Sequence, residues 1–198
     1  KVYFPEGAVN ANINEFIPIS NPNDQPTRIV AIARYESGVR DQILFDQVIG
    51  GRSRSGFTIT TPALYAANQQ LVRKDPNGGT MTYALELRAD KPVAATFSHY
   101  DANILPRNSA VGEAFTSRTD TTWSFASVTK GNNIDDFILW YNTTNTIGKV
   151  TLTFYPTGGG QAYDAVFDLS PYYRGGMAIN FGSNPITLSG TSTPATMP

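Results

Sequence analysis

The feature that most constrains this chain of 198 residues is an internal repeat. Matching residues return in the same order at a nearly constant offset, first 121 residues (142 − 21) and then, after a one-residue gap, 120 (155 − 35). A repeat of this length predicts two units built on one plan, since each supersecondary unit recurs with its sequence. The matched pairs are Phe4/Phe125, Asn12/Asn133, Ile13/Ile134, Phe16/Phe137, Ile17/Ile138, Asn21/Asn142, Val30/Val150 and Tyr35/Tyr155.

The repeat carries the pattern of β-strands. In Lys149–Tyr155, valine, leucine and phenylalanine alternate with two threonines, which is typical of a strand with one buried face; Arg28–Tyr35 is its counterpart. Clusters of Gly, Pro, Asn and Asp separate the segments, as expected of turns. Further strands are predicted at Phe16–Ser20, Gln42–Gln47, Gly56–Thr60, Thr80–Arg88, Pro92–Tyr100, Thr121–Val128, Asp136–Tyr141, Tyr163–Leu169 and Gly176–Phe181.

The predicted fold is therefore all-β, with two tandem immunoglobulin-like antiparallel β-sandwich units. We expect the first unit at residues 1–101, a second and incomplete one at 102–190, and a Thr/Pro-rich linker tail at 191–198. One interruption is Thr61–Val72, where a Thr N-cap and a following Pro predict a short helix or ordered insertion in the first unit.

The two units are expected to end differently. The first continues into a segment that reads as a closing hairpin, Tyr83–Phe97. The second has only Pro185–Leu188 left to pair, so either it is truncated or residues 108–122 complete it. An incomplete sandwich would present a bare strand edge for pairing with a neighbouring copy.

Several motifs resemble a known group of proteins. They are Tyr3-Phe-Pro-Glu-Gly7, the stretch Glu15–Pro22, and the late Ala-Asp-Lys-Pro-Val-Ala-Ala of Ala89–Ala95. Together they resemble the repeated β-sandwich modules of large bacterial cell-surface and exported proteins. The resemblance implies an extracellular location and a sandwich architecture, but no established activity. The second copy departs from the pattern, because Ser127 stands where the first copy has Glu6 and Thr143 where it has Pro22.

Charge and composition exclude several functions. The net charge is −1, so we expect no nucleic-acid partner, and no apolar run is long enough for membrane insertion of this segment. The chain has no cysteine, which rules out zinc–thiolate sites and cysteine nucleophiles. The expected partners are neighbouring repeats of the same protein or other surface proteins, with polysaccharide as an alternative.

Catalytic chemistry is not favoured by the residues. His99 is the only histidine, and alternation places it on the same face of a strand as apolar residues, which favours a structural role. Asp46 recurs as Asp168, and such repetition also favours a structural role over a catalytic carboxylate. We expect no cofactor, and calcium is the one candidate ligand. It is a candidate because acidic turn loops supply the oxygen atoms that calcium binds. The candidate calcium residues are Asp24, Asp75, Asp135 and Asp136.

Aromatic pairs give the alternative function. Trp140–Tyr141 and Tyr172–Tyr173 are adjacent, so alternation turns one ring of each pair outward, where it could stack on a sugar ring. A carbohydrate-binding module would lose sugar binding without losing stability when Trp140, Tyr141 or Tyr172 is replaced. The leading hypothesis is a non-catalytic extracellular structural or adhesive module, a spacer or display unit of a bacterial surface or secreted protein.

Overall fold

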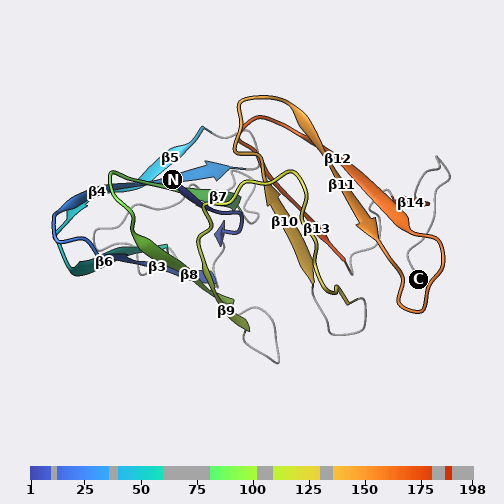
Figure 1. Cartoon of the computed structure of the whole chain (residues 1–198), viewed down its shortest axis with the longest axis horizontal. Helices are drawn as coiled ribbons and strands as arrows, with labels where there is room; N and C mark the ends of the chain where they lie inside the picture. Colours follow the sequence, from blue (N-terminus) through green and yellow to red (C-terminus); the bar gives the residue numbers. More distant parts are fainter. Residues whose placement is uncertain are drawn as a thin grey trace. The chain divides into compact units, whose positions relative to one another are not determined.

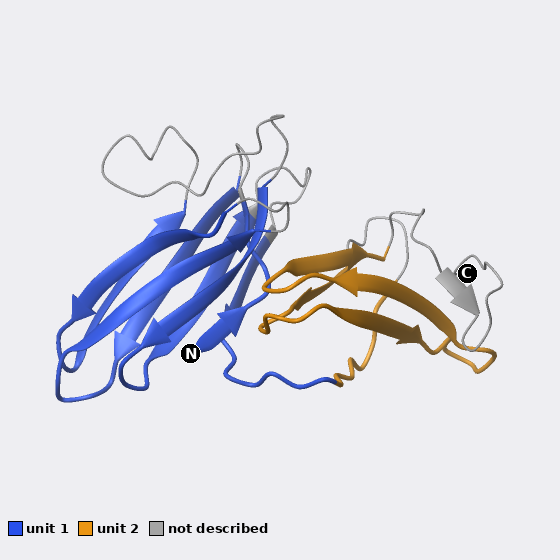
Figure 2. Cartoon of the chain, turned by 90° about the horizontal axis from the view of Figure 1, so that it is seen from above, with its two compact units in different colours: residues 1–121 blue, residues 122–198 orange. Residues whose placement is uncertain are grey.

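The computed structural model describes residues 1–9, 13–35, 40–59, 81–101, 109–129, 136–179 and 186–188. The chain divides into two compact units, Lys1–Thr121 and Thr122–Pro198 (Figure 2). The described residues form antiparallel strands and contain no helix, so the predicted all-β class is confirmed. The expected helix or insertion at Thr61–Val72 and the tail at 191–198 lie outside the described residues.

Unit 1 is a two-layer sandwich of antiparallel sheets, in which strands β3 to β9 are labelled in Figure 1. One sheet has the order β6-β3-β8-β9, and the other has the order β1-β7-β4-β5 with β2 also on β7. The strands are β1 (Val2–Phe4), β2 (Ala8–Val9), β3 (Ile13–Asn21), β4 (Thr27–Tyr35), β5 (Gln42–Ile49), β6 (Ser53–Ile59), β7 (Met81–Ala89), β8 (Ala94–Asp101) and β9 (Ser109–Ala114).

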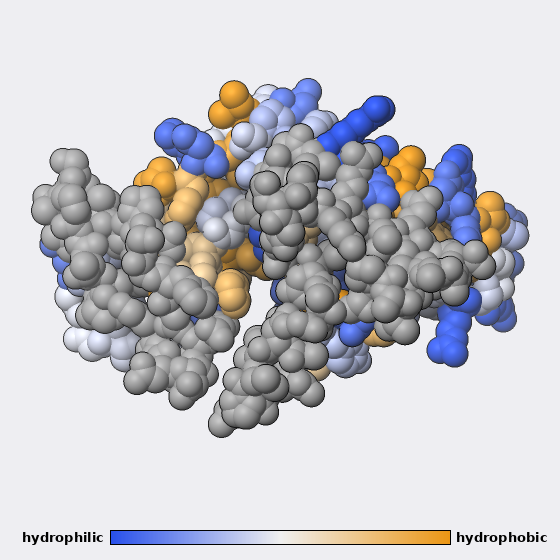
Figure 3. Space-filling model, turned by 180° about the vertical axis from the view of Figure 1, so that it is seen from behind, coloured by the Kyte–Doolittle hydropathy of each residue, from blue (hydrophilic) through white to orange (hydrophobic). Residues whose placement is uncertain are grey.

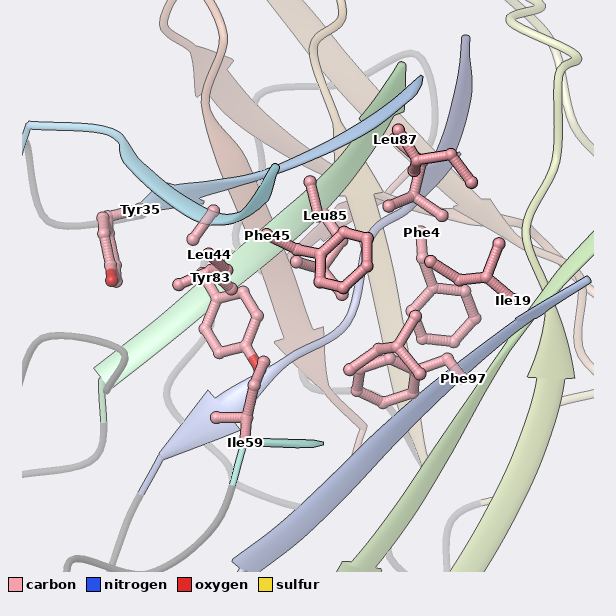
Figure 4. Close-up of a cluster of buried hydrophobic side chains, with 14 of the residues drawn as sticks. Phe4, Ile19, Tyr35, Leu44, Phe45, Ile59, Tyr83, Leu85, Leu87 and Phe97 are labelled. Carbon is pink, nitrogen blue, oxygen red and sulfur yellow. The ribbon is translucent and has the colours of Figure 1, made fainter. Parts of the chain in front are cut away.

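Alternation along the strands builds the core between these sheets. In β3, Ile17 and Ile19 face inward and are at most 1% exposed, while the residues between them face out. Phe4 from one sheet stacks on Phe97 from the other, with ring centroids 4.4 Å apart (Figure 4). Burial of these large rings supplies much of the driving force that holds the two sheets together.

The chain crosses from one sheet to the other between β3 and β4, between β5 and β6, and between β7 and β8. The predicted closing hairpin at Tyr83–Phe97 is therefore wrong, because β7 pairs with β4 whereas β8 pairs with β3. The two strands form an arch that places β7 beside β4 in one sheet and β8 beside β3 in the other. Strand β9 pairs with β8, so residues 109–114 belong to unit 1, which extends to Thr121, beyond the expected boundary at Asp101.

Unit 2 contains the pair β10-β13 and the sheet β11-β12-β14. Its strands are β10 (Phe137–Tyr141), β11 (Gly148–Phe154), β12 (Tyr163–Leu169), β13 (Arg174–Ala178) and β14 (Ile186–Leu188). The predicted strand at Thr121–Val128 is wrong: this segment forms no strand, and Trp123 and Phe125 are 52% and 63% exposed. Apolar residues in a short segment do not make a strand unless another backbone is placed to pair with it.

A buried asparagine clamps the crossings in unit 1. The side-chain amide of Asn21 donates to the carbonyl oxygens of Gln25 and Gly50, both at 2.9 Å. Its oxygen accepts the backbone N–H of Asn23 at 3.1 Å. Asn21 is 1% exposed, so these bonds replace contacts with water that burial has removed. One side chain therefore ties the β3–β4 crossing to the β5–β6 crossing.

The same arrangement occurs in unit 2. The amide of Asn142 donates to the carbonyls of Thr146 at 2.8 Å and Ser170 at 3.0 Å, and its oxygen accepts the backbone N–H of Thr144. These contacts tie the β10–β11 crossing to the β12–β13 crossing. In both units, moreover, the second crossing contains a non-glycine residue at positive φ, Arg52 at 48° and Tyr172 at 50°.

Strand register also agrees between the units. Ser20 lies opposite Arg54 in the β3–β6 pair, and Tyr141 lies opposite Arg174 in the β10–β13 pair, an offset of 121 for the first residues (141 − 20) and 120 for the second (174 − 54).

The sequence alignment erred by one residue in the next strand. The wholly buried residues of β4 include Ile29 and Ala31, and the inner, half-buried residues of β11 include Val150 and Leu152. The difference in residue number between equivalent positions of the two units therefore stays at 121 (150 − 29). A one-residue gap, which matched Val30 with Val150, would place buried residues of one unit opposite exposed residues of the other. Burial differs accordingly: Tyr35 is 3% exposed and Tyr155 is 81% exposed.

We expect Asn21→Ala to lower the free energy of unfolding of unit 1 by about 2–3 kcal/mol, because buried carbonyl groups lose their donor. Urea unfolding followed by circular dichroism measures the loss. Ser20→Ala is the matched control on the exposed face of the same strand and should stay within about 0.5 kcal/mol of wild type. Equal losses in the two variants would contradict a clamping role for Asn21.

Candidate functional site

Trp140 of the predicted aromatic platform faces the interior of unit 2. Its ring centroid lies 4.9 Å from that of Phe167, and it packs against buried Ala165 and Met177. Opposite it on β13, a side chain at Gly175 would approach the indole Nε1 to 2.5 Å, so glycine leaves the space that the ring occupies. This packing accounts for Trp140 without a bound sugar.

The remaining aromatic candidates lie at the surface to different extents. Tyr141 and Tyr173 are half-buried, whereas Tyr172 is 42% exposed. The backbone N–H of Tyr172 donates to the carbonyl of Thr144 at 3.0 Å, within the turn that Asn142 holds. Among the four predicted residues, Tyr172 is therefore the most exposed.

The acidic candidates are engaged in local contacts. Asp24 forms an exposed ion pair with Arg52, and Asp136 accepts the backbone N–H of Thr129 at 2.6 Å. Asp75 and Asp135 lie outside the described residues. Within the described ranges, no group of three or more acidic or histidine side chains comes together in a way that could hold a metal ion.

The repeated aspartates form ion pairs across neighbouring strands. Asp46 on β5 pairs with Arg28 on β4 at 2.7 Å, and Asp168 on β12 pairs with Lys149 on β11 at 3.0 Å. Both pairs lie on solvent-facing surfaces of the strands, where such contacts contribute little to stability. In both units the aspartate thus links two neighbouring strands.

Unit 1 contains a buried carboxylate that the motif analysis did not single out. Glu15 is wholly buried in β3, and its Oε1 lies 2.9 Å from Nδ1 of His99 and accepts the backbone N–H of Ala8. Its Oε2 accepts the Tyr83 hydroxyl. The sequence did carry a signal, since Glu15 alternates with inward-facing Ile13 and Ile17. Burial raises the pKa of the Glu15 carboxyl, and the hydrogen bonds from His99 and Tyr83 partly oppose this rise.

The geometry of this group does not match a hydrolase site. A histidine that acts as general base has one ring nitrogen held by a carboxylate and the other near a nucleophile that substrate can reach. Here Glu15 has no exposed surface, and His99 is 8% exposed with its ring 6.3 Å from that of Phe97. The pair therefore joins strands β3 and β8 inside the sandwich, where a substrate has little access to either group.

A second buried carboxylate, Glu86 on β7, is held by cations. Arg34 contacts Oε2 at 2.8 Å, Arg88 contacts Oε1 at 2.7 Å, and Lys1 lies 3.5 Å from Oε1. Burial by itself would raise the pKa of Glu86, but the hydrogen bonds from Arg88 and Arg34 outweigh it, so the pKa is lowered. Glu86 thus stays ionised on the outer face of the sheet, beneath basic side chains that compensate both of its oxygens.

A surface depression of about 220 Å³ lies over β3, β6 and β8, and its lining is largely apolar. Arg54 is the one charged residue in that lining, so the depression lacks the convergent polar groups that a catalytic or ligand-binding pocket uses for orientation. On the face drawn in Figure 3, hydrophobic residues reach the described surface in several places between hydrophilic ones. The described residues include no helix long and apolar enough to cross a membrane.

Comparison with known proteins gives little further guidance. No protein-family model matches the chain, and no curated protein matches it. Among solved structures, the chain is similar to the crystal structure of Thermotoga maritima 1070, with 12% identity and a TM-score of 0.43 over 58% of this chain and 90% of that one. A likeness at this level supports no argument about function.

We expect the pH dependence of stability to report on Glu15. Because its pKa is raised in the folded state, the native protein binds this proton more tightly than the unfolded chain does. The free energy of unfolding should therefore fall as the pH rises from the ordinary value of 4.5 to the raised pKa, and this contribution should level off above it. Glu15→Gln should remove that slope, as measured by urea unfolding between pH 4.5 and about 8.

The matched control for that experiment is Glu113→Gln, an exposed glutamate on β9, which should leave the profile unchanged. Glu86 does not contribute to the slope in this pH range, because its pKa is lowered from 4.5. Its contribution to the free energy of unfolding is lost only as the pH falls below 4.5 through that lowered value. A profile that is the same in wild type and Glu15→Gln would contradict the assignment.

Trp140→Ala should lower the free energy of unfolding of unit 2 by about 2 kcal/mol, because the residue packs against Phe167. The loss is smaller than for a fully buried tryptophan, since Trp140 is only half-buried. Faster hydrogen exchange at the amides of β10 and β13 would measure this loss. Tyr155→Ala, at a residue that is 81% exposed, is the control and should leave exchange unchanged. Unaltered exchange in Trp140→Ala would show instead that the ring is not part of the core.

Proposed function

We propose that the chain is a non-catalytic structural or adhesive module of an extracellular or cell-surface protein, formed by two tandem copies of one immunoglobulin-like sandwich unit. Its role is to hold distance and to present strand edges and loops to neighbouring repeats or other surface proteins. The extracellular location rests on the resemblance of Tyr3–Gly7, Glu15–Pro22 and Ala89–Ala95 to surface-protein repeats.

The observation that carries this proposal is the recurrence of the asparagine clamp. Asn21 and Asn142 occupy the same place relative to their strands and bind turn carbonyls with the same pattern of donors and acceptors. A catalytic site would not be expected to recur with the framework, whereas a clamp that defines the fold has to recur with each copy. The repeated element is thus the scaffold itself.

The described ionisable groups support the same proposal. Glu15, between the sheets, and Glu86, on the outer face of β7, are compensated by partners on adjacent strands, and Asp46 and Asp168 bind basic residues on neighbouring strands. Polar groups arranged in this way join strands to one another. A reaction site instead leaves such groups facing a cleft that a substrate can enter.

Carbohydrate binding is the second candidate, and a specific observation keeps it open. Trp123, Phe125 and Tyr172 are 52%, 63% and 42% exposed, and exposed rings of this kind can stack on sugars. Tyr172 is the predicted platform residue that can be replaced with least disturbance. Because its φ is positive, asparagine is the suitable replacement, since it tolerates that conformation better than alanine.

The test is binding of the full chain to a broad glycan and polysaccharide array, with and without calcium. We expect no saturable binding in either condition, as a spacer has no sugar site. A saturable signal that disappears in Tyr172→Asn but persists in Tyr155→Asn would overturn the proposal in favour of a carbohydrate-binding module. A signal that depends on calcium would in addition identify a cation site.

A further inference from the structure

The outward faces of the two sheets in unit 1 differ in how their charged groups are compensated. On the face of β4, β5 and β7, Arg28 pairs with Asp46 and Arg34 pairs with Glu86. On the other face, Arg54 is the one charged side chain among the outward residues of β3, β6 and β8 (Figure 1). Arg54 is exposed and forms no ion pair with any described residue. This second face therefore carries a positive charge that the described residues leave uncompensated.

The rest of that face is apolar or small. Phe16 and Tyr100 are 39% and 48% exposed, and their rings meet edge to face with centroids 5.7 Å apart. The depression of about 220 Å³ lies on the same face and includes Arg54 in its lining. The outward residues that line it are small or uncharged: Pro18, Ser20, Ala94 and Thr96.

This combination is typical of the centre of a protein–protein interface. Aromatic residues and arginine are enriched there, whereas lysine, glutamate and aspartate are depleted. A contiguous apolar area that stays exposed on a folded unit marks an interaction surface. Because the depression lacks converging polar groups, it suits side chains of another protein better than a small ligand.

The register of the strands fixes the spacing of these features. Ser20 lies opposite Arg54, and Phe16 lies opposite Thr58. At the rise of an extended strand, the four residues from Ser20 to Phe16 span about 13 Å. The positive charge and the aromatic pair thus lie at the two ends of a row, with Pro18 and the depression between them.

We propose that this face docks a protein partner through an extended, acidic and apolar segment. Side chains on one face of an extended segment recur at every second residue, so three of them span the row. The first is a carboxylate that pairs with the Arg54 guanidinium, the second is an apolar side chain in the depression, and the third packs on Phe16 and Tyr100. Charge complementarity selects an acidic over a basic partner. The inference names the partner for the display role proposed above and so rests on it.

The probe is a random peptide library displayed on phage and selected against the full chain. We expect the enriched peptides to place an acidic residue two or four positions from a bulky apolar or aromatic one. When Arg54→Glu is the target, the enriched peptides should instead be basic, because the sign of the charge at the end of the row is reversed. A synthetic copy of an enriched peptide should shift the NMR signals of amides in β3, β6 and β8.

Matched variants of the chain test the row. Arg54→Glu should weaken binding of the enriched peptide at least about tenfold, whereas Arg40→Glu, at an exposed arginine between β4 and β5, should not. Tyr100→Ser should likewise weaken binding, and Val48→Ser, at a residue of the other sheet that is 66% exposed, is its control. Urea unfolding reports whether each variant is folded. Should Tyr100→Ser lose stability, the two arginine variants still decide the question.

Four results would overturn the inference: no enrichment, enriched peptides without acidic residues, NMR shifts outside β3, β6 and β8, or equal losses in Arg54→Glu and Arg40→Glu. Self-association of the chain with shifts on this face would also overturn it, by making a second copy the occupant. These outcomes are separate from the glycan array. A sugar signal lost in Tyr172→Asn would contradict the spacer function but not this face, and a failed selection would leave the spacer function unaffected.

Discussion

The clamp made by Asn21 and its equivalent Asn142 is the interaction on which the rest of each unit depends. A sandwich requires the chain to pass repeatedly from one sheet to the other, and at each passage the backbone leaves the ladder that satisfied its polar groups. A buried asparagine supplies two donors and an acceptor at such a point, so it can bind carbonyls from two crossings and an N–H from the turn. Because both crossings share one side chain, the relative position of the two sheets is fixed where the strands end.

Once the crossings are fixed, the inner faces of the strands can meet and exclude water. In unit 1 this brings Phe4 against Phe97 and buries Ile17, Ile29 and Leu85 completely. Burial also explains why Glu15, between the sheets, and Glu86, on the outer face of β7 beneath basic side chains, need partners. A buried ionised group is tolerated only where hydrogen bonds or opposite charge replace hydration. The two carboxylates meet this requirement differently, and the pKa of one is raised while that of the other is lowered.

Unit 2 has the same clamp, and its described residues form five strands, β10 to β14. Its core joins Trp140 and Phe167 from opposite sheets, and Gly175 makes room for the indole. The inner residues of β11, Val150, Leu152 and Phe154, are half-buried, whereas Ile29, Ala31 and Ala33 on β4 are wholly buried.

By itself the sequence determined the all-β class, most of the strands and the recurrence of Asn21 at Asn142, because alternation, turn residues and spacing are local properties. It could not show which residue of β4 is equivalent to Val150 of β11. Ile29 and Val30 are both apolar, and a shift of one residue changes only which face of the strand is buried. Nor could it place β7 and β8 in opposite sheets, because a hairpin and an arch have the same local pattern. The inward position of Trp140 and the pairing of Glu15 with His99 likewise depended on strands that are far apart in the chain, so only the tertiary structure decided them.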